Sequence, residues 1–207
     1  MGRSRGFMNT STVSFAMVGW LALATGISGL LGFVLIILFF TVGQPFGTLN
    51  DIFIGLTAIL SVVLVWMSSS VFQGQFPFLG RVALVIATLG GILVLVGSVL
   101  ALTSRAGWYL SGLYMAAGYG LVGLWLLVLG FSALRGNSIP QSLSIFALVA
   151  GLVLALGLVA IPGIFHGTDS QEYEFTLINS LWWAASLGYV AVYPVWSILL
   201  GRNLLLK

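Results

Sequence analysis

Six long apolar runs, separated by short gaps that hold nearly all of the charged residues, constrain this chain more than any other feature of its sequence. The runs cover about residues 14–42, 52–72, 82–103, 108–134, 142–165 and 176–200. A helix that crosses the hydrocarbon of a bilayer needs roughly 20 apolar residues. The pattern therefore predicts six transmembrane helices. No gap is long enough to separate domains, so residues 1–207 are predicted to form a single domain.

The composition favours a membrane environment. Hydrophobic residues make up 60% of the chain and charged residues only 5%, whereas a soluble domain has about 25% charged residues. There is too little polar surface here to cover a water-soluble globule, so lipid must solvate most of the exterior. We predict an all-α, polytopic transmembrane bundle, with the lipid bilayer as its first partner.

The charged residues are sorted between the two sides of the predicted bundle. The gaps on one side contain all of the acidic residues, Asp51, Asp169, Glu172 and Glu174, and a single basic residue, Arg105. The other side contains Arg3, Arg5, Arg81, Arg135, Arg202 and Lys207. Because basic residues favour the cytoplasmic side, both termini are predicted to be cytoplasmic. The basic residues occur singly rather than in a cluster, which excludes a nucleic-acid partner.

The rarity of metal-binding and nucleophilic residues limits the chemistry of the chain. It has no cysteine and one histidine, His166, which excludes disulfides, thiolate catalysis and a zinc site with three histidines. The segment 118–123 matches G-x-G-x-x-G, but it falls within a predicted span and lacks the strand that precedes a dinucleotide site. We expect no cofactor and no metal, and we assign no catalytic residue.

Small residues, prolines and tryptophans indicate how the helices pack. Small residues recur at four-residue spacing in four runs, which predicts close helix contacts within one monomer. They are Ala22 and Gly26, Ser28 and Gly32, Gly112 to Gly120, Ala147 to Ala155, and Ala184 and Gly188. Pro194 is expected to kink the sixth helix, and Pro162 to end the fifth. The tryptophans are expected to form two interfacial belts, Trp20, Trp66, Trp125 and Trp196 on the cytoplasmic side and Trp108, Trp182 and Trp183 on the other. For Trp66 and Trp125 a packing role stays open.

Polar side chains follow one face of three predicted helices. Thr57, Ser61 and Ser68 lie on the second, below Asn50 and Asp51 at its outer mouth; the fourth carries Tyr109, Ser111 and Tyr114; the sixth carries Asn179, Trp183, Ser186, Tyr193 and Ser197. If these faces converge, they line a pocket open to the outer leaflet or the outside. It would suit a neutral or amphipathic ligand, because no charge lies within a span. The candidate ligand-binding residues are Asn50, Asp51, Ser61, Tyr114, Asn179, Trp183 and Tyr193. The favoured alternative is that such groups join helices by hydrogen bonds worth about 0.6 kcal/mol each.

The gap after the fifth run holds the remaining reactive groups. His166 is either a ligand of a pigment or, as we favour, an interfacial residue that caps the fifth helix. The acids of segment 166–175 either bind a divalent cation weakly or, as we favour, form a solvated loop. The only candidate acid–base groups are Asp51, His166 and Asp169.

Several short motifs resemble a known group of proteins. Asn50-Asp51 opens the second helix, Gly80-Arg81 opens the third, Trp125 lies in the fourth, Pro140 precedes the fifth, and the chain ends with the run 193–202. Together these features resemble small, uncharacterised six-helix bacterial integral membrane proteins of the DUF4386-like kind. The resemblance implies a bacterial inner membrane and carries no catalytic residue with it.

Three classes of function remain open. The first is a non-enzymatic sensor, regulator or accessory subunit that acts through helix packing or by binding a small neutral or lipid-like ligand. The second is a facilitator or carrier of a neutral or amphipathic molecule, which requires a polar cavity that reaches both faces. The third is an intramembrane enzyme with a site at the outer face. Another membrane protein or a second copy of the chain is the expected kind of protein partner, because the loops are short.

Overall fold

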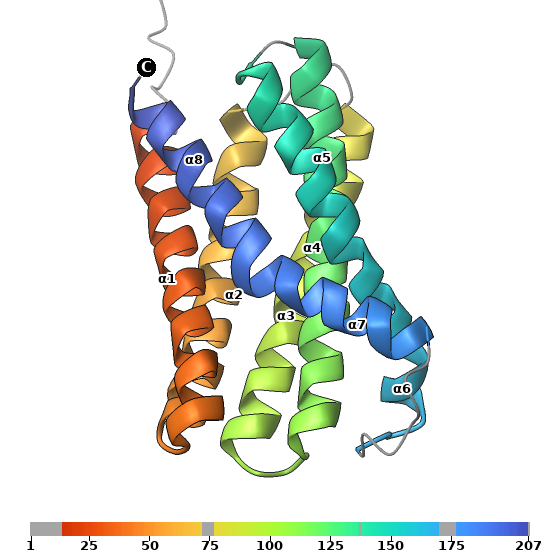
Figure 1. Cartoon of the computed structure of the whole chain (residues 1–207). Coiled ribbons are helices and arrows are strands. Elements are labelled where there is room, and N and C mark those ends of the chain that lie inside the picture. Colours follow the sequence, from red (N-terminus) through yellow and green to blue (C-terminus); the bar gives the residue numbers. More distant parts are fainter. Residues whose placement is uncertain (1–13, 72–76, 137, 170–176, 207) are drawn as a thin grey trace, which may run out of the picture.

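The structure, a computed structural model, describes residues 14–71, 77–136, 138–169 and 177–206. These residues are almost entirely helical, and none of them forms a strand (Figure 1). The elements are α1 (Phe15–Val42), α2 (Phe46–Val71), α3 (Pro77–Leu102), α4 (Trp108–Gly136), α5 (Gln141–Ala155), the 3-10 helix η1 (Leu156–Ala160), α6 (Ile161–Phe165), α7 (Leu177–Leu187), the π-helix η2 (Gly188–Val192) and α8 (Tyr193–Leu205).

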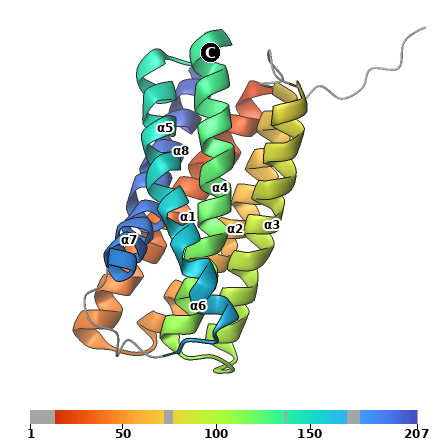
Figure 2. The same ribbon diagram turned by 90° about the vertical axis from the view of Figure 1, so that its right-hand side faces the viewer.

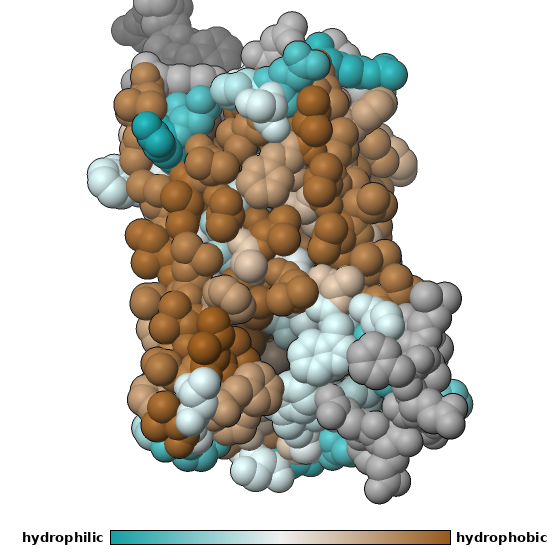
Figure 3. Space-filling view, in the orientation of Figure 1, coloured by the Kyte–Doolittle hydropathy of each residue, from teal (hydrophilic) through white to brown (hydrophobic). Residues whose placement is uncertain are grey.

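Six helices are long and apolar enough to cross a membrane, as the sequence predicted. Four are continuous helices, and two are composite: α5, η1 and α6 form the span Gln141–Phe165, and α7, η2 and α8 form Asn179–Leu205. Large apolar side chains such as Val85 and Leu152 point outward, and apolar residues cover most of the surface in Figure 3. The chain is therefore a multi-pass membrane protein by fold.

Two ends of the bundle can be distinguished. At the terminal end, α1 begins beside the end of α8: a Cβ placed on Gly19 would lie 2.9 Å from Leu205 Cγ. The turn end carries the connections between α1 and α2 and between α3 and α4 (Figure 1). Among the described charges, Arg81, Arg135 and Arg202 lie at the terminal end, and Asp51, Arg105 and Asp169 at the turn end. Arg3, Arg5, Glu172, Glu174 and Lys207 lie outside the described residues.

Two helices begin earlier than hydropathy predicted. α2 starts at Phe46 rather than at Ile52, and α3 starts at Pro77 rather than at Val82. A helix can continue through polar residues at the end of a span, where Gln44 Oε1 accepts a hydrogen bond from the Thr48 amide at 3.4 Å. Asp51 consequently lies inside the second span rather than in the gap before it, which corrects the prediction.

Neighbouring spans pack through small residues, which include Gly26, Gly120 and Gly151 from the predicted rows and further glycines that were not predicted. α4 lies between α3 and α5, and α1 lies between α2 and α8. At the crossing of α3 and α4, a Cβ on Gly118 would lie 2.5 Å from the carbonyl oxygen of Gly90. At the crossing of α4 and α5, a Cβ on Gly123 would lie 2.7 Å from the carbonyl oxygen of Gly151. Such backbone contact takes the place of the hydrophobic driving force that helices lack in lipid.

Both prolines lie in the first turn of a helical segment that directly follows irregular turns, Pro162 after η1 and Pro194 after η2. Pro162 does not end the fifth span, so that prediction is wrong: the helix continues through α6 to Phe165 beside α4 (Figure 2). Pro194 does break the sixth span. It has no N–H and its ring clashes with the preceding turn, and the wider turns of η2 lie directly before it.

The core near the terminal end is aromatic. The rings of Tyr193 and Trp196 are stacked with centroids 6.1 Å apart, and Trp125 meets Trp196 edge-on at 6.3 Å. Trp196 Nε1 donates a hydrogen bond of 3.3 Å to the Leu143 carbonyl on α5. Both tryptophans are buried, which corrects the assignment of Trp196 to an interfacial belt and agrees with the packing role left open for Trp125. Trp66, for which the same alternative was open, is 54% exposed and donates to Thr88 Oγ1.

Candidate functional site

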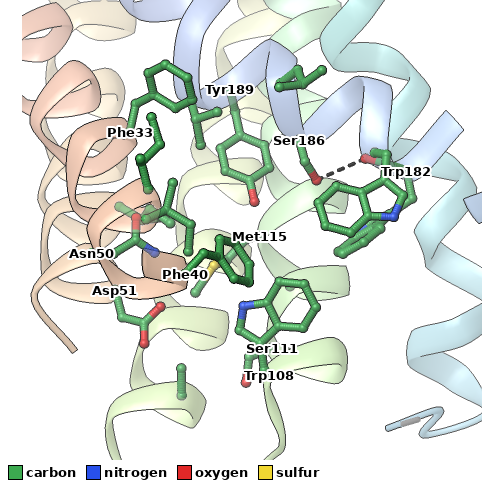
Figure 4. Close-up of a pocket in the computed structure, with 18 residues that line it drawn as sticks. Phe33, Phe40, Asn50, Asp51, Trp108, Ser111, Met115, Trp182, Ser186 and Tyr189 are labelled. Carbon is green, nitrogen blue, oxygen red and sulfur yellow. Dashed lines mark hydrogen bonds between the residues drawn. The ribbon is translucent and has the colours of Figure 1, made fainter. Parts of the chain in front are cut away.

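An apolar cavity of about 210 Å³ lies between α1, α2, α4 and α7 in the half of the bundle near the turn end. Figure 4 shows its walls. The apolar cavity is lined by Phe33, Ile36, Ile37, Phe40, Asn50, Asp51, Ile54, Ala101, Trp108, Ser111, Gly112, Met115, Trp182, Trp183, Ser186, Leu187, Tyr189 and Val190. For scale, an apolar cavity of about 150 Å³ can hold benzene. The space is therefore sufficient for a ring or a short alkyl chain.

The cavity exists because the sixth span leaves α1 halfway along the bundle. Near the terminal end, Gly26 allows α8 to approach α1, and a Cβ there would lie 2.5 Å from the Pro194 carbonyl oxygen. Beyond η2, α7 runs obliquely toward α5 and η1 rather than along α1 (Figure 1). The surface has a hollow between α1 and α7 (Figure 3). The cavity thus opens at the side of the bundle, through the apolar surface that faces lipid.

A second space, the vestibule, adjoins the apolar cavity at the turn end. It measures about 380 Å³ and is bordered by polar backbone and side chains, including Gln44, Ser104 and Gly107. Both spaces share the wall residues Ile36, Asn50, Asp51, Ala101 and Trp108. Asn50 and Asp51 therefore lie at the junction between an apolar compartment and a more polar one.

Three buried polar atoms of residues in the cavity wall have no hydrogen-bond partner among the described residues: Asn50 Oδ1, Ser111 Oγ and Trp182 Nε1. Asn50 is only 4% exposed and Ser111 only 1%. Buried polar atoms are nearly always hydrogen-bonded, and an exception calls for an explanation. Figure 4 shows the Asn50 amide and the Asp51 carboxylate on one wall, with Trp108 across from them and Phe40 in between. A bound molecule with a polar end would satisfy these atoms.

Four aromatic rings from three helices surround the opening of the cavity. Phe40 on α1 meets Trp108 on α4 edge-on, with ring centroids 6.3 Å apart. Trp108 in turn contacts Trp182 at 5.8 Å and Trp183 at 6.1 Å, both on α7. Phe40 is 63% exposed, whereas Trp182 is buried. The cluster joins α1 to α7 through side chains.

Tyrosines close the cavity toward the terminal end. Tyr189 points into it from η2 (Figure 4), and its ring stacks on Tyr119 with centroids 4.9 Å apart and planes at 8°. The Tyr119 hydroxyl donates to the Ile54 carbonyl at 3.3 Å. Beyond them, the Tyr193 hydroxyl donates to Ser61 Oγ at 2.9 Å. The cavity therefore opens at the turn end and sideways, and ends at this floor.

The structure brings together only some of the candidate residues. Asn50, Asp51 and Trp183 line the apolar cavity. Ser61 and Tyr193 are bonded to each other below its floor, and Asn179 accepts a 2.9 Å hydrogen bond from the Tyr109 hydroxyl. Tyr114 lines neither space and lies near Gly97 of α3. These last four residues, Ser61, Tyr193, Asn179 and Tyr114, thus lie between helices and not in the cavity wall.

Sequence reasoning missed most of the wall. Phe33 and Met115 look like ordinary packing residues in the sequence, and Trp182 was assigned to the interfacial belt although it is buried. Tyr189 was missed because a stripe with a period of 3.6 residues assumes an unbroken α-helix, and η2 shifts that register. The sequence did contain a signal for the break in the sixth helix. Gly188 is followed by Pro194, and a proline together with irregular turns marks a break in a helix.

The three candidate acid–base groups do not share a cleft. The Asp169 carboxylate accepts hydrogen bonds from the amides of Gly107 at 2.6 Å and Leu110 at 3.2 Å. It therefore caps the start of α4, where a negative charge is stabilising. His166 lines neither the cavity nor the vestibule. Among the described residues, no group of three His, Cys, Asp or Glu side chains can hold a metal ion.

Fold and site together define a six-helix multi-pass membrane protein with a cavity that opens at one end and sideways. Comparisons with protein-family models, curated proteins and solved structures found no match for this chain.

Proposed function

We propose that this protein is a non-enzymatic membrane sensor, regulator or accessory subunit that binds a small amphipathic molecule in the apolar cavity. The main support for this proposal is that the wall of an apolar cavity of about 210 Å³ contains the unpartnered oxygens of Asn50 and Ser111. Apolar walls with a few convergent polar groups are typical of ligand sites. The apolar body of the ligand lies against Ile37 and Met115, and its polar end faces the vestibule.

A receptor role is favoured over a carrier role by the floor of the cavity. A carrier needs access from both sides, whereas Tyr119 and Tyr189 stack across the path and Tyr193 is bonded to Ser61 beneath them. A carrier is the second candidate because the floor rests on η2 and Pro194, the break in the sixth span. Rotation of α7 about this break would move Tyr189 out of the path.

We further propose that the protein lies in a bacterial inner membrane with its terminal end in the cytoplasm. The described arginines Arg81, Arg135 and Arg202 at that end support this orientation, because basic residues remain on the cytoplasmic side. The cavity then opens to the outer leaflet. The resemblance to six-helix bacterial membrane proteins, including DUF4386-like ones, is part of this proposal.

The test is saturable binding of a simple amphiphile. The protein in phosphatidylcholine nanodiscs is titrated with 10-bromodecanol, whose bromine quenches nearby tryptophans, and Trp108, Trp182 and Trp183 line the cavity. We expect quenching that saturates in the wild type and becomes linear in Ala101→Phe, since Ala101 lines both spaces. The matched control is Leu152→Phe on the lipid-facing side of α5, where Leu152 is 62% exposed.

Two results decide the test. Saturation in the wild type and in Leu152→Phe, lost in Ala101→Phe at an unchanged thermal midpoint, supports the proposal. Linear quenching in all three proteins, as expected for partition into lipid alone, overturns it.

A further inference from the structure

We infer that the ligand of the apolar cavity is a lipophilic organic cation, in which an ammonium-type head group carries an alkyl chain or a ring. This inference rests on the proposed function, because it assigns a chemical class to the molecule bound at the same site. The inference depends on the position of one carboxylate, Asp51, which faces a cluster of aromatic rings in a largely apolar wall (Figure 4).

The charge of the site is negative. Among the described residues that line the cavity and the vestibule, Asp51 is the only charged one. Arg105, the nearest basic residue in sequence at the turn end, is exposed and lines neither space. The absence of mid-span charge in the sequence suggested a neutral ligand, but the early start of α2 places this carboxylate inside a span. An ionisable group within a span marks a functional site and needs a partner of opposite charge.

Two unpartnered oxygens at the site are acceptors or can serve as acceptors, whereas the indole N–H of Trp182 can only donate. Asn50 Oδ1 is an acceptor only, and the Ser111 hydroxyl can accept; neither has a partner among the described residues. Within the part of the chain that the structure describes, no Lys, Arg or His side chain lines either space to hold an anionic group. A molecule with a phosphate or carboxylate would bring its negative charge close to Asp51, so a cation without such a group fits better.

The aromatic rings supply the second attraction for a cation. Phe40, Trp108 and Trp183 come from three helices, and the Trp108 ring centroid lies 6.3 Å from that of Phe40 and 6.1 Å from that of Trp183. The face of an aromatic ring attracts cations, and aromatic cages recognise quaternary ammonium groups. The rings also form the sideways opening, so a cation that enters from the leaflet passes them before it reaches Asp51.

The apolar remainder of the cavity fits the body of such a molecule. Phe33, Ile37, Met115 and Val190 continue from the ring cluster toward the tyrosine floor. A methylene group buried there is stabilised relative to water, although much less relative to lipid. The alkyl chain of the ligand therefore favours binding from water, whereas its head group determines which amphiphile the site selects from the bilayer.

The test compares a cation with a neutral molecule of the same shape. Radiolabelled decyltrimethylammonium is bound to the protein in nanodiscs of digalactosyl diacylglycerol, a neutral lipid that has no ammonium group. The competitor is 2,2-dimethyldodecane, in which a carbon replaces the charged nitrogen. We expect the cation to bind saturably and the neutral isostere to compete at least about tenfold more weakly, since opposite charges attract strongly at short range near a protein surface.

Variants distinguish an effect of the Asp51 charge on cation binding from a loss of the fold. We expect Asp51→Asn to weaken cation binding about tenfold or more and Asp51→Glu to retain most of it. Trp183→Leu should weaken it about threefold to thirtyfold, as expected for a cation–π contact. Trp66→Leu, which removes a similarly exposed tryptophan on α2 away from both spaces, is the control and should change nothing. Thermal midpoints confirm that each variant is folded.

Repeating the measurement in phosphatidylcholine nanodiscs identifies the source of the cation. Weaker apparent binding in that lipid means that its choline head group competes for the same cation site, whereas unchanged binding means that the site takes a free amphiphile. Both results support recognition of a cation.

Two results overturn the inference. If the neutral isostere competes as well as the cation and Asp51→Asn binds both equally, the ligand is not selected by charge, and the proposed amphiphile site still stands. If neither molecule binds saturably while 10-bromodecanol also fails, the inference falls together with the proposed function.

Discussion

The Tyr193 hydroxyl donates a 2.9 Å hydrogen bond to Ser61 Oγ, which joins the start of α8 to the middle of α2. Both residues are fully buried. Ser61 in turn donates to the Thr57 carbonyl at 2.6 Å. The bond therefore fixes the sixth span directly after its π-helical break and below the floor of the cavity.

Removing this bond should cost a modest amount of stability. Tyr193→Phe deletes the donor and Ser61→Ala the acceptor, and we expect a coupling energy of about 0.6 kcal/mol, with an upper limit of roughly 1.7 kcal/mol. The measurement is a double-mutant cycle on the free energy of unfolding in mixed micelles. If the two single effects simply add, the bond contributes nothing and the assignment is wrong.

The contact between Gly90 and Gly118 should not tolerate a side chain. A Cβ on Gly118 would lie 2.5 Å from the Gly90 carbonyl oxygen, so Gly118→Ala must push α3 and α4 apart. We expect a loss of about 1–3 kcal/mol, the typical cost of overpacking. Gly80→Ala is the matched control, because nothing lies within 4 Å of a Cβ there. Equal unfolding free energies for the two variants would contradict the close packing.

The Asp169 cap should protect the start of α4. Asp169→Ala leaves the amides of Gly107 and Leu110 without their acceptor, and the loss of a cap costs about 1 kcal/mol. We expect faster hydrogen exchange in peptides that cover residues 107–110, with Asp169→Asn intermediate because its amide oxygen still accepts. Exchange that is unchanged in both variants would show that the carboxylate does not cap the helix.

The absence of cysteine makes the orientation directly measurable. Thr103→Cys places a single thiol at the turn end, and Leu206→Cys places one at the terminal end; both positions are exposed. In intact cells an impermeant maleimide should label Thr103→Cys only, and Leu206→Cys should react only after the cells are opened. The reverse pattern would overturn the proposed sidedness, and with it the opening of the cavity to the outer leaflet.

The six spans were predictable because hydropathy over roughly 20 residues reflects the thickness of a bilayer. The site was less predictable for two physical reasons. Hydropathy does not define where a helix starts, so Asp51 was assigned to a gap although α2 begins at Phe46. Helical periodicity fails across an irregular turn, so Tyr189 was overlooked. The cavity itself arises from the oblique course of α7, which no pattern within one helix encodes.

The most direct test of the central claim maps where an amphiphile binds. Photolysis of a decanol that carries a diazirine on its chain, followed by mass spectrometry, should label α1 between Phe33 and Phe40 and α4 between Trp108 and Met115, and excess decanol should suppress the labelling. Labelling that instead follows lipid exposure, at Val85 and Leu152, and that excess decanol does not reduce would contradict a binding cavity between these helices.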